Sequence, residues 1–151
     1  MSHDPHKVIH RWFDEVWNQG REEVIDELLA PHGVGHGLGA GEGDVHGPAE
    51  FKVFWRNFRS LLPDVRIRIE DTVVQGEMVV VRIVAEGTHS DDGLGIPHTG
   101  KPVRVAGIIM VRVTNGQLVE AWNSWDQLGL LQQIGQAPSV GETNRFLSAT
   151  S

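Results

Sequence analysis

The chain has 151 residues and a formal net charge of -7, from 13 Lys and Arg residues against 20 Asp and Glu residues. This length fits a single domain, expected to cover residues 1–151. The acidic balance argues against nucleic acid as a partner because that binding depends mostly on basic side chains. Without any cysteine, the chain has no disulfide, thiol nucleophile or cysteine metal site.

Neither the longest apolar runs nor the first residues favour a membrane. Residues 78–81 and 107–111 form runs far shorter than the roughly 20 residues that a membrane-spanning helix needs. The first ten residues, MSHDPHKVIH, lack the basic start and the apolar run of a secretory signal. We therefore expect a cytoplasmic protein with no membrane partner.

Two helices are predicted at the start of the chain. Apolar residues recur there at helical spacing after Asp4, a residue type that often caps helices, and Pro5, which favours the first helical position. The pattern predicts one helix from about Pro5 to Asn18. A second, short helix is predicted to end before Pro31.

Glycine is dense between residues 33 and 47, where seven of fifteen positions are Gly. This segment predicts a short strand near residues 34–38, followed by a flexible loop. A third helix is predicted from Pro48 to the residue before Pro63, because its aromatic residues recur at spacings of three and four. These residues are Phe51, Phe54, Trp55 and Phe58.

After residue 64 the apolar period changes from 3.6 to 2, which is typical of strands. Four strands are predicted, over residues 65–74, 78–88, 103–114 and 117–125, and Asn115-Gly116 is a strong signal of a tight hairpin turn. The Gly- and Pro-rich link over residues 90–102 is expected to be a mobile lip.

These elements predict an α+β fold in which a curved antiparallel sheet wraps around the N-terminal helices. Such a sheet encloses a cone-shaped cavity, where a functional site is expected. The core is expected over about residues 5–135, and residues 136–151 are expected to form a loosely held tail.

Several motifs lie in the C-terminal half: GTH at residues 87–89, GIPHTGK at 95–101 and RVTNGQLVEAWNSWDQLGLLQQIG at 112–135. They resemble the SnoaL-like polyketide and ester cyclases, whose members carry a similar Gly-Ile-Pro-x-Thr-Gly lip and a Trp-x-x-Trp-Asp-x-Leu-Gly-Leu-x-x-Gln-x-Gly ending. HGPAEF and LLPDVRIRIED extend the likeness weakly upstream, so that it covers about residues 28–135.

The resemblance implies a cone-shaped barrel of the nuclear-transport-factor-2-like (cystatin-like) superfamily, often dimeric through the outer face of its sheet. It also implies a cofactor-free intramolecular aldol condensation on aromatic polyketide esters, in which a carboxylate on the last strand removes a proton. An ungapped match of the endings places Asn123 at the position of that aspartate and Ile109 at the position of its partner histidine. An amide is not basic near neutral pH, so under this alignment the known mechanism is not preserved.

Three residues are candidates for catalysis. Asn123, which the resemblance places on the pocket-facing side of the last strand, could hydrogen-bond an enolate or carbonyl oxygen, or serve as a polar group in the cavity wall. Asp126 could act as a base if it is partly buried, or cap the helix that follows it. His36 could face the pocket, where neighbouring glycines leave room for a ligand, or lie at the surface of a flexible loop.

Other residues are candidates for binding a substrate. His98, in the lip, could shield a bound ligand, although solvent exposure is the default for it and for His89. Four aromatic residues are expected at the cavity, where core packing and ligand contact are compatible. They are Phe54, Trp55, Phe58 and Trp125.

The expected partner is a small hydrophobic organic molecule, without a metal or an organic cofactor. Three histidines near the start share helical spacing, but a fraying terminus favours a solvated face over a metal site. They are His3, His6 and His10. A second copy of the chain is expected to cover the outer sheet face, where charged residues mix with apolar ones such as Ile108, Met110 and Trp122.

Two functions stay open from the sequence. The first is a cofactor-free enzyme of the cyclase, isomerase or hydratase type that acts on a small hydrophobic carbonyl compound by acid/base chemistry. The second is a non-catalytic ligand-binding or accessory protein that retains the fold but has Asn123 in place of the cyclase aspartate. A pairing of His36 with Asp126 would favour the first function, and Asn123 favours the second.

Overall fold

The structure is a computed structural model that describes residues 3–38, 43–90 and 97–136. The centre of the expected lip and all but the first residue of the expected tail lie outside these ranges. Among the described residues, no helix is long and apolar enough to cross a membrane.

The first expected helix is confirmed, and its second half is wound more widely than an α-helix. Helix α1 (Pro5–Arg11) begins after Asp4, whose side chain accepts a hydrogen bond of 3.0 Å from a backbone N–H two residues on. The chain continues as the π-helix η1 (Trp12–Asn18). At its end the N–H of Gln19 bonds to the carbonyl of Asp14, five residues earlier.

The π-helix changes which residues share a face. Residues five apart lie about 140° apart around an α-helix, whereas a π-helix joins them by one hydrogen bond and brings them nearer to one face. The wider turn therefore directs both Trp12 and Trp17 to the interior, where they are 6% and 5% exposed. Short π-helical turns often occur at functional sites.

Two further helices flank the sheet, and a last short one follows it. Helix α2 (Glu23–Leu28) is the expected short helix. Helix α3 (Gly47–Leu61) buries Phe51 and Trp55, as the aromatic spacing predicts. Helix α4 (Gln127–Gln133) follows the last strand.

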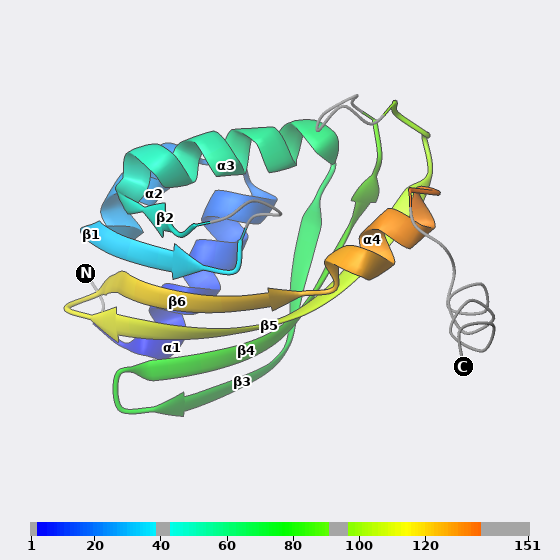
Figure 1. Ribbon diagram of the computed structural model, residues 1–151. Coiled ribbons are helices and arrows are strands. Elements are labelled where there is room, and N and C mark those ends of the chain that lie inside the picture. The colour runs from blue at the N-terminus through cyan, green and yellow to red at the C-terminus, as the bar shows by residue number, and fades with distance from the viewer. Residues whose placement is uncertain (1–2, 39–42, 91–96, 137–151) are drawn as a thin grey trace.

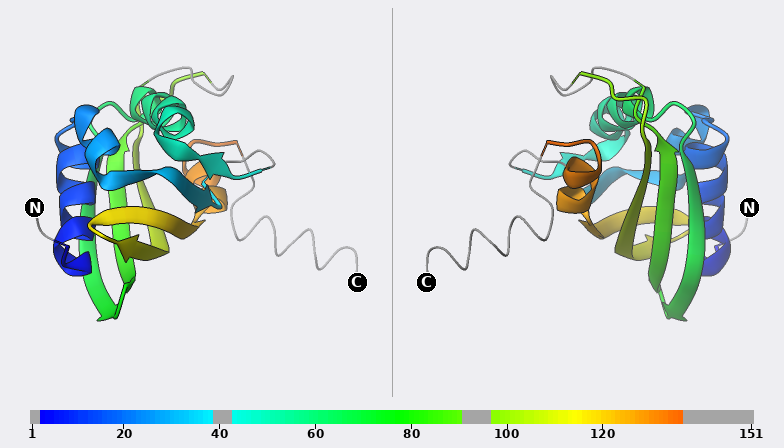
Figure 2. Two further views of the ribbon diagram at one scale, coloured as in Figure 1. Left: turned by 90° about the vertical axis from the view of Figure 1, so that its left-hand side faces the viewer. Right: turned by 90° about the vertical axis from the view of Figure 1, so that its right-hand side faces the viewer.

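Six strands form one sheet in the order β2-β1-β6-β5-β4-β3. The four strands predicted in the second half are confirmed to within one residue at each end. Figures 1 and 2 show that the sheet bends, with α1, η1 and α3 on its concave side. The strands are β1 (Leu29–His36), β2 (Val45–His46), β3 (Arg66–Gln75), β4 (Met78–Thr88), β5 (Pro102–Thr114) and β6 (Gln117–Trp125).

The sheet is mixed, which corrects the expectation of a wholly antiparallel sheet. Strand β1 pairs with β6 in parallel, with Gly35 opposite Ala121, whereas the other pairs are antiparallel. No hairpin joins β1 to β6, so the preceding helix α2 and not a tight turn sets the direction of β1. Strand β1 also begins at Leu29, five residues before the predicted start.

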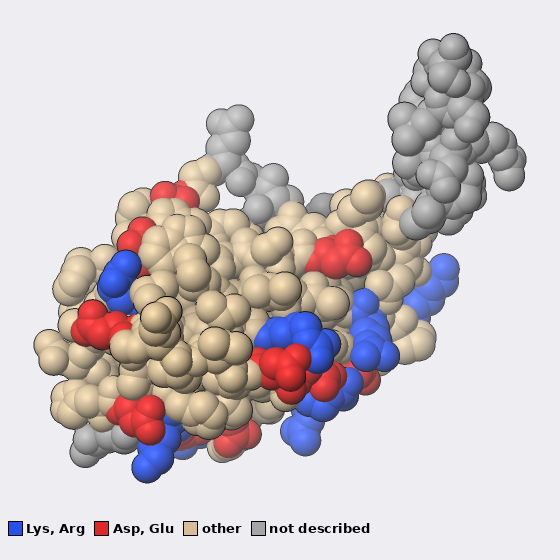
Figure 3. All heavy atoms as spheres, turned by 90° about the horizontal axis from the view of Figure 1, so that it is seen from below, with Lys and Arg blue, Asp and Glu red and all other residues tan. Residues whose placement is uncertain are grey.

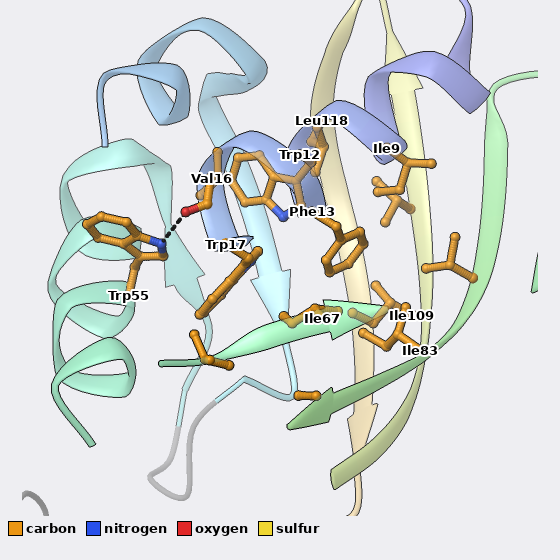
Figure 4. Packing of buried hydrophobic residues seen from close by; sticks show 14 of the residues in the cluster. Ile9, Trp12, Phe13, Val16, Trp17, Trp55, Ile67, Ile83, Ile109 and Leu118 are labelled. Atoms are coloured by element: carbon orange, nitrogen blue, oxygen red, sulfur yellow. Dashed lines mark hydrogen bonds between the residues drawn. The ribbon is translucent and has the colours of Figure 1, made fainter. Parts of the chain in front are cut away.

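The core lies between the helices and the concave face of the sheet. Inward residues of β4 and β5 alternate with exposed ones, and Ile83 and Ile109 are 0% and 5% exposed. Figure 4 shows Ile9 and Phe13 of the first helical segment facing these strands. Burial of this many large apolar side chains accounts for most of the stabilisation of such a fold, at roughly 1.5–3 kcal/mol for each.

Candidate functional site

A cavity of about 90 Å³ lies between the concave face of the sheet and the helices. This is several times the roughly 10–15 Å³ that one water requires. Its wall is almost wholly apolar, and seven of its residues are aromatic: Trp12, Phe13, Trp17, Phe51, Phe54, Phe58 and Trp125. On the side of the sheet, Gly33 and Gly35 leave the wall without side chains.

Three of the four aromatic residues expected at the cavity line it. Phe54, Phe58 and Trp125 are wall residues, whereas Trp55 is not. Trp55 follows Phe54 by about 100° around α3, so its ring is directed to η1, where its Nε1 donates a hydrogen bond of 3.2 Å to the carbonyl oxygen of Val16. Trp55 is therefore a core residue, and the expectation that it lines the cavity is wrong.

His98 is exposed and does not line the cavity either. His89, for which solvent exposure was expected, is fully buried at 0%. Its backbone pairs with Lys101 and Gly100, and its Nδ1 accepts a hydrogen bond of 3.3 Å from the N–H of Thr99. The backbone hydrogen bonds of His89 with Gly100 and Lys101 hold the two ends of the lip together, and the His89 ring is buried there. The Gly-rich sequence around His89 does not indicate this burial.

Asn123 lies in the cavity wall, on the same face of β6 as Ala121 and Trp125. Its Nδ2 donates a hydrogen bond of 2.9 Å to the carbonyl oxygen of His36 and so ties β6 to β1. A side-chain amide has two N–H donors and one acceptor oxygen. One N–H and the Oδ1 atom therefore have no partner among the described residues.

A bulge in β6 interrupts the alternation of its residues between the cavity and the outer face. The pairing with β5 shifts between Arg112 and Val113, which leaves Val119 unpaired. In place of Val119, Leu118 faces the cavity. The strict alternation assumed from the sequence fails at this one residue because a bulge inserts an extra position into the ladder.

Asp126 is a helix cap at the surface. Its Oδ1 accepts a hydrogen bond of 2.8 Å from the N–H of Gly129 in the first turn of α4. The residue is exposed and does not line the cavity. The role of Asp126 as a helix cap is thus confirmed, and the partial burial on which its role as a base depended is not present.

His36 lies on the outer face of the sheet, contrary to the expectation that it faces the cavity. Successive residues of a strand point to opposite faces, so when Gly35 faces the cavity, His36 points away from it. Its ring stacks on Trp122, with centroids 5.7 Å apart and planes inclined by 26°. The structure therefore separates His36 from the cavity and does not bring it together with Asp126.

Two carboxylates hold the His36 ring. Its Nε2 lies 2.7 Å from Glu120 Oε2, and its Nδ1 lies 2.9 Å from Asp44 Oδ1. The hydrogen bond to Glu120, and then the one to Asp44, raise the pKa of His36 above its usual value. Glu120 borders the cavity, but its carboxylate is engaged by this histidine.

The sequence did not identify the other polar groups of the wall, which are Gln127 and the indoles of Trp12 and Trp17. Apolar periodicity marks Trp12 and Trp17 as buried, but it does not distinguish a core ring from one that borders a cavity. Glu120 is the only ionisable residue among the described wall residues. No group of three or more metal-ligating side chains lies within the ranges that the structure describes.

The outer face of the sheet mixes exposed apolar and paired charged side chains. Ile108 and Met110 are 53% and 39% exposed. Arg68 contacts Glu86 across β3 and β4, with a distance of 3.2 Å between nitrogen and oxygen. Seen from below, Lys and Arg side chains lie beside Asp and Glu side chains, with uncharged surface around them (Figure 3). The dimer expected through the outer face stays a prediction.

Comparisons with known proteins agree with this geometry. A family model described as SnoaL-like polyketide cyclase matches residues 7–134. IdmH from Streptomyces antibioticus, a proposed polyketide cyclase, is 32% identical over 87% of this chain and 99% of that chain, with a TM-score of 0.76. A proposed SnoaL-like polyketide cyclase from Jannaschia sp. CCS1 is 25% identical over 89% of this chain and 93% of that chain, with a TM-score of 0.78.

A more distant structure extends the likeness in fold alone. A hypothetical protein from Catenulispora acidiphila with a ketosteroid isomerase-like fold is 17% identical, over 87% of this chain and 94% of that chain, with a TM-score of 0.71. A comparison with curated proteins found no match. The resemblance inferred from the C-terminal motifs and the α+β fold expected from it are confirmed.

Proposed function

The chain belongs to the SnoaL-like polyketide cyclase family, and from that membership we propose that it is a cofactor-free cyclase-type enzyme for a small, largely apolar carbonyl compound. The structure neighbours and the family match support the cyclase type of function. The compound would bind in the cavity between the sheet and the helices, with its carbonyl oxygens directed at the few polar groups of the wall.

One observation carries the choice of ligand: the described wall is aromatic and aliphatic, and apart from Glu120 its polar side-chain atoms belong to neutral amides and indoles. The single wall carboxylate, that of Glu120, is already paired with His36. A charged ligand would lose its hydration in this cavity without an opposite charge to replace it, and that costs several kcal/mol. A neutral molecule with an apolar body and carbonyl oxygens fits these groups.

The geometry supports cyclisation through folding of the ligand. A cavity that holds two reacting carbons of one ligand in contact restricts the torsions between them on binding, so that part of the entropic barrier to ring closure is met before the reaction. The second N–H of Asn123 can polarise a carbonyl oxygen of the ligand, a contribution of about 10² to 10³-fold for one such donor. Neither Asp126 nor His36 is placed to take a proton from a molecule in the cavity.

A second function is a ligand-binding protein without turnover. The observation that favours it is the lack of a free carboxylate or imidazole in the described part of the wall. General base catalysis typically contributes about 10² to 10⁴-fold. A member of the family without a general base could therefore keep the cavity and bind the ligand, while the reaction would be too slow to be useful.

One experiment separates the two functions. The purified chain is incubated with a panel of aromatic β-ketoesters, binding is followed by tryptophan fluorescence, and products are followed by mass spectrometry. Ring closure gives a product of unchanged mass, or of that mass less one water. The variant Ala121→Phe fills the cavity, and Ala106→Phe, an equal change on the exposed face of β5, is the matched control.

Ring-closed product from the wild-type chain and from Ala106→Phe, but not from Ala121→Phe, is the result expected for an enzyme. Binding with the same dependence on the cavity but without product would favour the ligand-binding function. No binding and no product across the panel would contradict both. Circular dichroism shows whether each variant is folded before the comparison is made.

A further inference from the structure

The indole N–H of Trp12 has no acceptor among the described residues, yet it is not sealed in the protein, because Nε2 of His89 is the only fully buried side-chain nitrogen or oxygen there that lacks a partner. Trp12 is 6% exposed, and within the ranges that the structure describes no oxygen accepts a hydrogen bond from its Nε1. A fully buried Trp N–H usually finds a partner within the protein, whereas one that borders a cavity can donate to a molecule bound there. Trp55 shows the usual case, because its Nε1 bonds to the carbonyl oxygen of Val16 at 3.2 Å.

Trp12 differs from Trp55 in what its ring borders. Trp12 lines the cavity, whereas Trp55 does not. Figure 4 shows the Trp12 nitrogen on the side of its ring that faces Phe13 and Trp17, which are both wall residues, and it shows the hydrogen bond of Trp55 as a dashed line. The free donor of Trp12 is thus presented to the same space in which Asn123 presents its second N–H.

Trp17 also lacks an acceptor among the described residues, but its surroundings differ. Its ring meets Phe51, Phe54 and Phe58 at 90°, 76° and 88°, with centroids 5.5–6.4 Å apart. Such edge-to-face packing stabilises an aromatic ring without a hydrogen bond. Among the aromatic rings that the structure describes, Trp12 meets only Phe51 at close range, with a tilt of 48°.

Trp12 lies in a π-helix, which is rare in proteins. Trp12 is the first residue of the π-helix η1, and the wider turn directs both Trp12 and Trp17 to the cavity. An α-helix over the same residues would place the two rings about 140° apart. The π-helical turn narrows the angle between the two rings, and both rings line the cavity.

We infer that the Nε1–H of Trp12 donates to a carbonyl oxygen of the bound ligand and so sets its orientation in the cavity. This inference rests on the proposed function, because it requires a ligand in that cavity. A neutral carbonyl oxygen matches a neutral donor in an apolar wall, and a methylene group at that place would leave the donor unpaired. Trp12 thus selects ligands that carry an oxygen at the helix side of the cavity, opposite the sheet that carries Asn123.

The test uses two probes of nearly equal shape, 1-tetralone and tetralin, which differ in one carbonyl oxygen. Their dissociation constants are measured by fluorescence or calorimetry for the wild-type chain, for Trp12→Phe and for Trp55→Phe. One lost hydrogen bond corresponds to about a threefold to tenfold loss of affinity. Trp12→Phe is expected to weaken tetralone by about that factor and tetralin by less than about twofold.

Trp55→Phe is the matched control, because it removes an indole N–H that bonds to the protein and lies outside the cavity wall. It should lower stability and leave the ratio of the two dissociation constants unchanged. If Trp12→Phe does not fold, benzothienylalanine at residue 12 replaces the N–H by sulfur and keeps the ring shape. In ¹H–¹⁵N spectra, the indole signal of Trp12 should move downfield with tetralone and not with tetralin.

The outcomes separate this inference from the proposed function. If both probes bind the wild-type chain and the ratio of their dissociation constants is unchanged in Trp12→Phe or its benzothienyl counterpart, the inference is overturned and the ligand cavity stands. If neither probe binds the wild-type chain, both the cavity as a binding site and the role of Trp12 are overturned. A reduced ratio in the Trp12 variants alone is the result expected.

Discussion

The Nε2 atom of His36 lies 2.7 Å from Oε2 of Glu120, and this contact joins two neighbouring strands on the outer face of the sheet. The other ring nitrogen of His36 contacts Asp44, which follows the glycine-rich segment after β1. When it is protonated, the imidazole between these two carboxylates holds the end of β1 and the start of β2 against β6. The same strands supply Gly35 and Asn123 to the cavity wall.

Stability should depend on pH through His36. Its pKa is raised in the folded state by Glu120 and then Asp44, so its contribution is complete below the unfolded value of about 6.5 and is lost as the pH rises through the folded pKa. The group is 30% exposed, so we expect an effect of only about 0.5 kcal/mol. Urea denaturation at intervals from pH 6 to pH 9 measures the free energy of unfolding.

The variant His36→Gln should remove this decline with pH, and Glu120→Gln should reduce it. Asp71→Asn is a suitable control, because it breaks the exposed ion pair with Arg82 and changes no group that titrates near neutral pH. A decline of equal slope in His36→Gln and the wild-type chain would show that the ion pairs of His36 are not its source.

Asp126 should matter for stability and not for ligand binding. Asp126→Ala is expected to lower the free energy of unfolding by about 1 kcal/mol, because the N–H of Gly129 loses its acceptor. Asp126→Asn should cost less, since Asn caps helices about as well as Asp. A loss of turnover of about 10²-fold or more in Asp126→Asn at an equal folded fraction would instead assign it a role as base.

Gly129 offers a second test of this cap. A Cβ atom at this position would overlap the carboxylate of Asp126. Gly129→Ala should therefore lose most of the benefit that alanine normally brings to a helix and destabilise the chain relative to the wild type. In the background of Asp126→Ala the same change should be neutral or stabilising, which a double-mutant cycle measures.

Two copies of the chain should pack against each other through the outer faces of their sheets and form a two-fold dimer. Ile108 and Met110 leave apolar surface exposed on β5, and a charge there should oppose association. The pair Ile108→Glu and Met110→Glu is expected to give a folded monomer by light scattering. Val53→Glu, an equal change at a 57% exposed residue of α3, should leave the dimer intact. A monomeric wild-type chain at micromolar concentration would contradict this prediction.

Local signals in the sequence predicted much of the fold. The Asn115-Gly116 turn has positive φ at both residues, 52° and 78°, as a tight hairpin of this type requires. The caps at Asp4 and Asp126 were likewise readable, because a cap depends only on the few residues that follow it. Such features need no knowledge of distant parts of the chain.

The site was less predictable because it depends on contacts between distant segments. The face on which His36 lies is set by the register of β1 against β6, whose contacting residues are 84 positions apart. The bulge at Val119 and the burial of His89 likewise depend on how strands pair. The π-helix that turns Trp12 to the cavity has the same apolar spacing as an ordinary helix and so gives no separate signal.

Asn123→Asp places a carboxylate at the position where the resemblance to the cyclases leads us to expect their aspartate. Nδ2 of Asn123 donates to the carbonyl oxygen of His36, and an ionised Asp has only acceptors to offer there. We expect a loss of about 1–3 kcal/mol in the free energy of unfolding at pH 8. Burial beside Ile109 and Trp125 should also raise the pKa of the new carboxyl group.

The sign of the pH dependence separates this effect from simple loss of the amide. A carboxyl group whose pKa is raised in the folded state lowers the free energy of unfolding once the pH exceeds the unfolded pKa of about 3.9. This loss grows until the pH passes the folded pKa. Asn123→Asp should therefore approach wild-type stability near pH 4, where the protonated acid can donate to the carbonyl of His36. Asn123→Ala should lose about 1 kcal/mol at every pH, because it removes the same bond without adding a charge. If Asn123→Asp gains ring-closing activity that the wild-type chain lacks, the wild-type chain is a binding protein with the fold of a cyclase. If Asn123→Asp loses activity that the wild-type chain has, the amide of Asn123 contributes to the reaction.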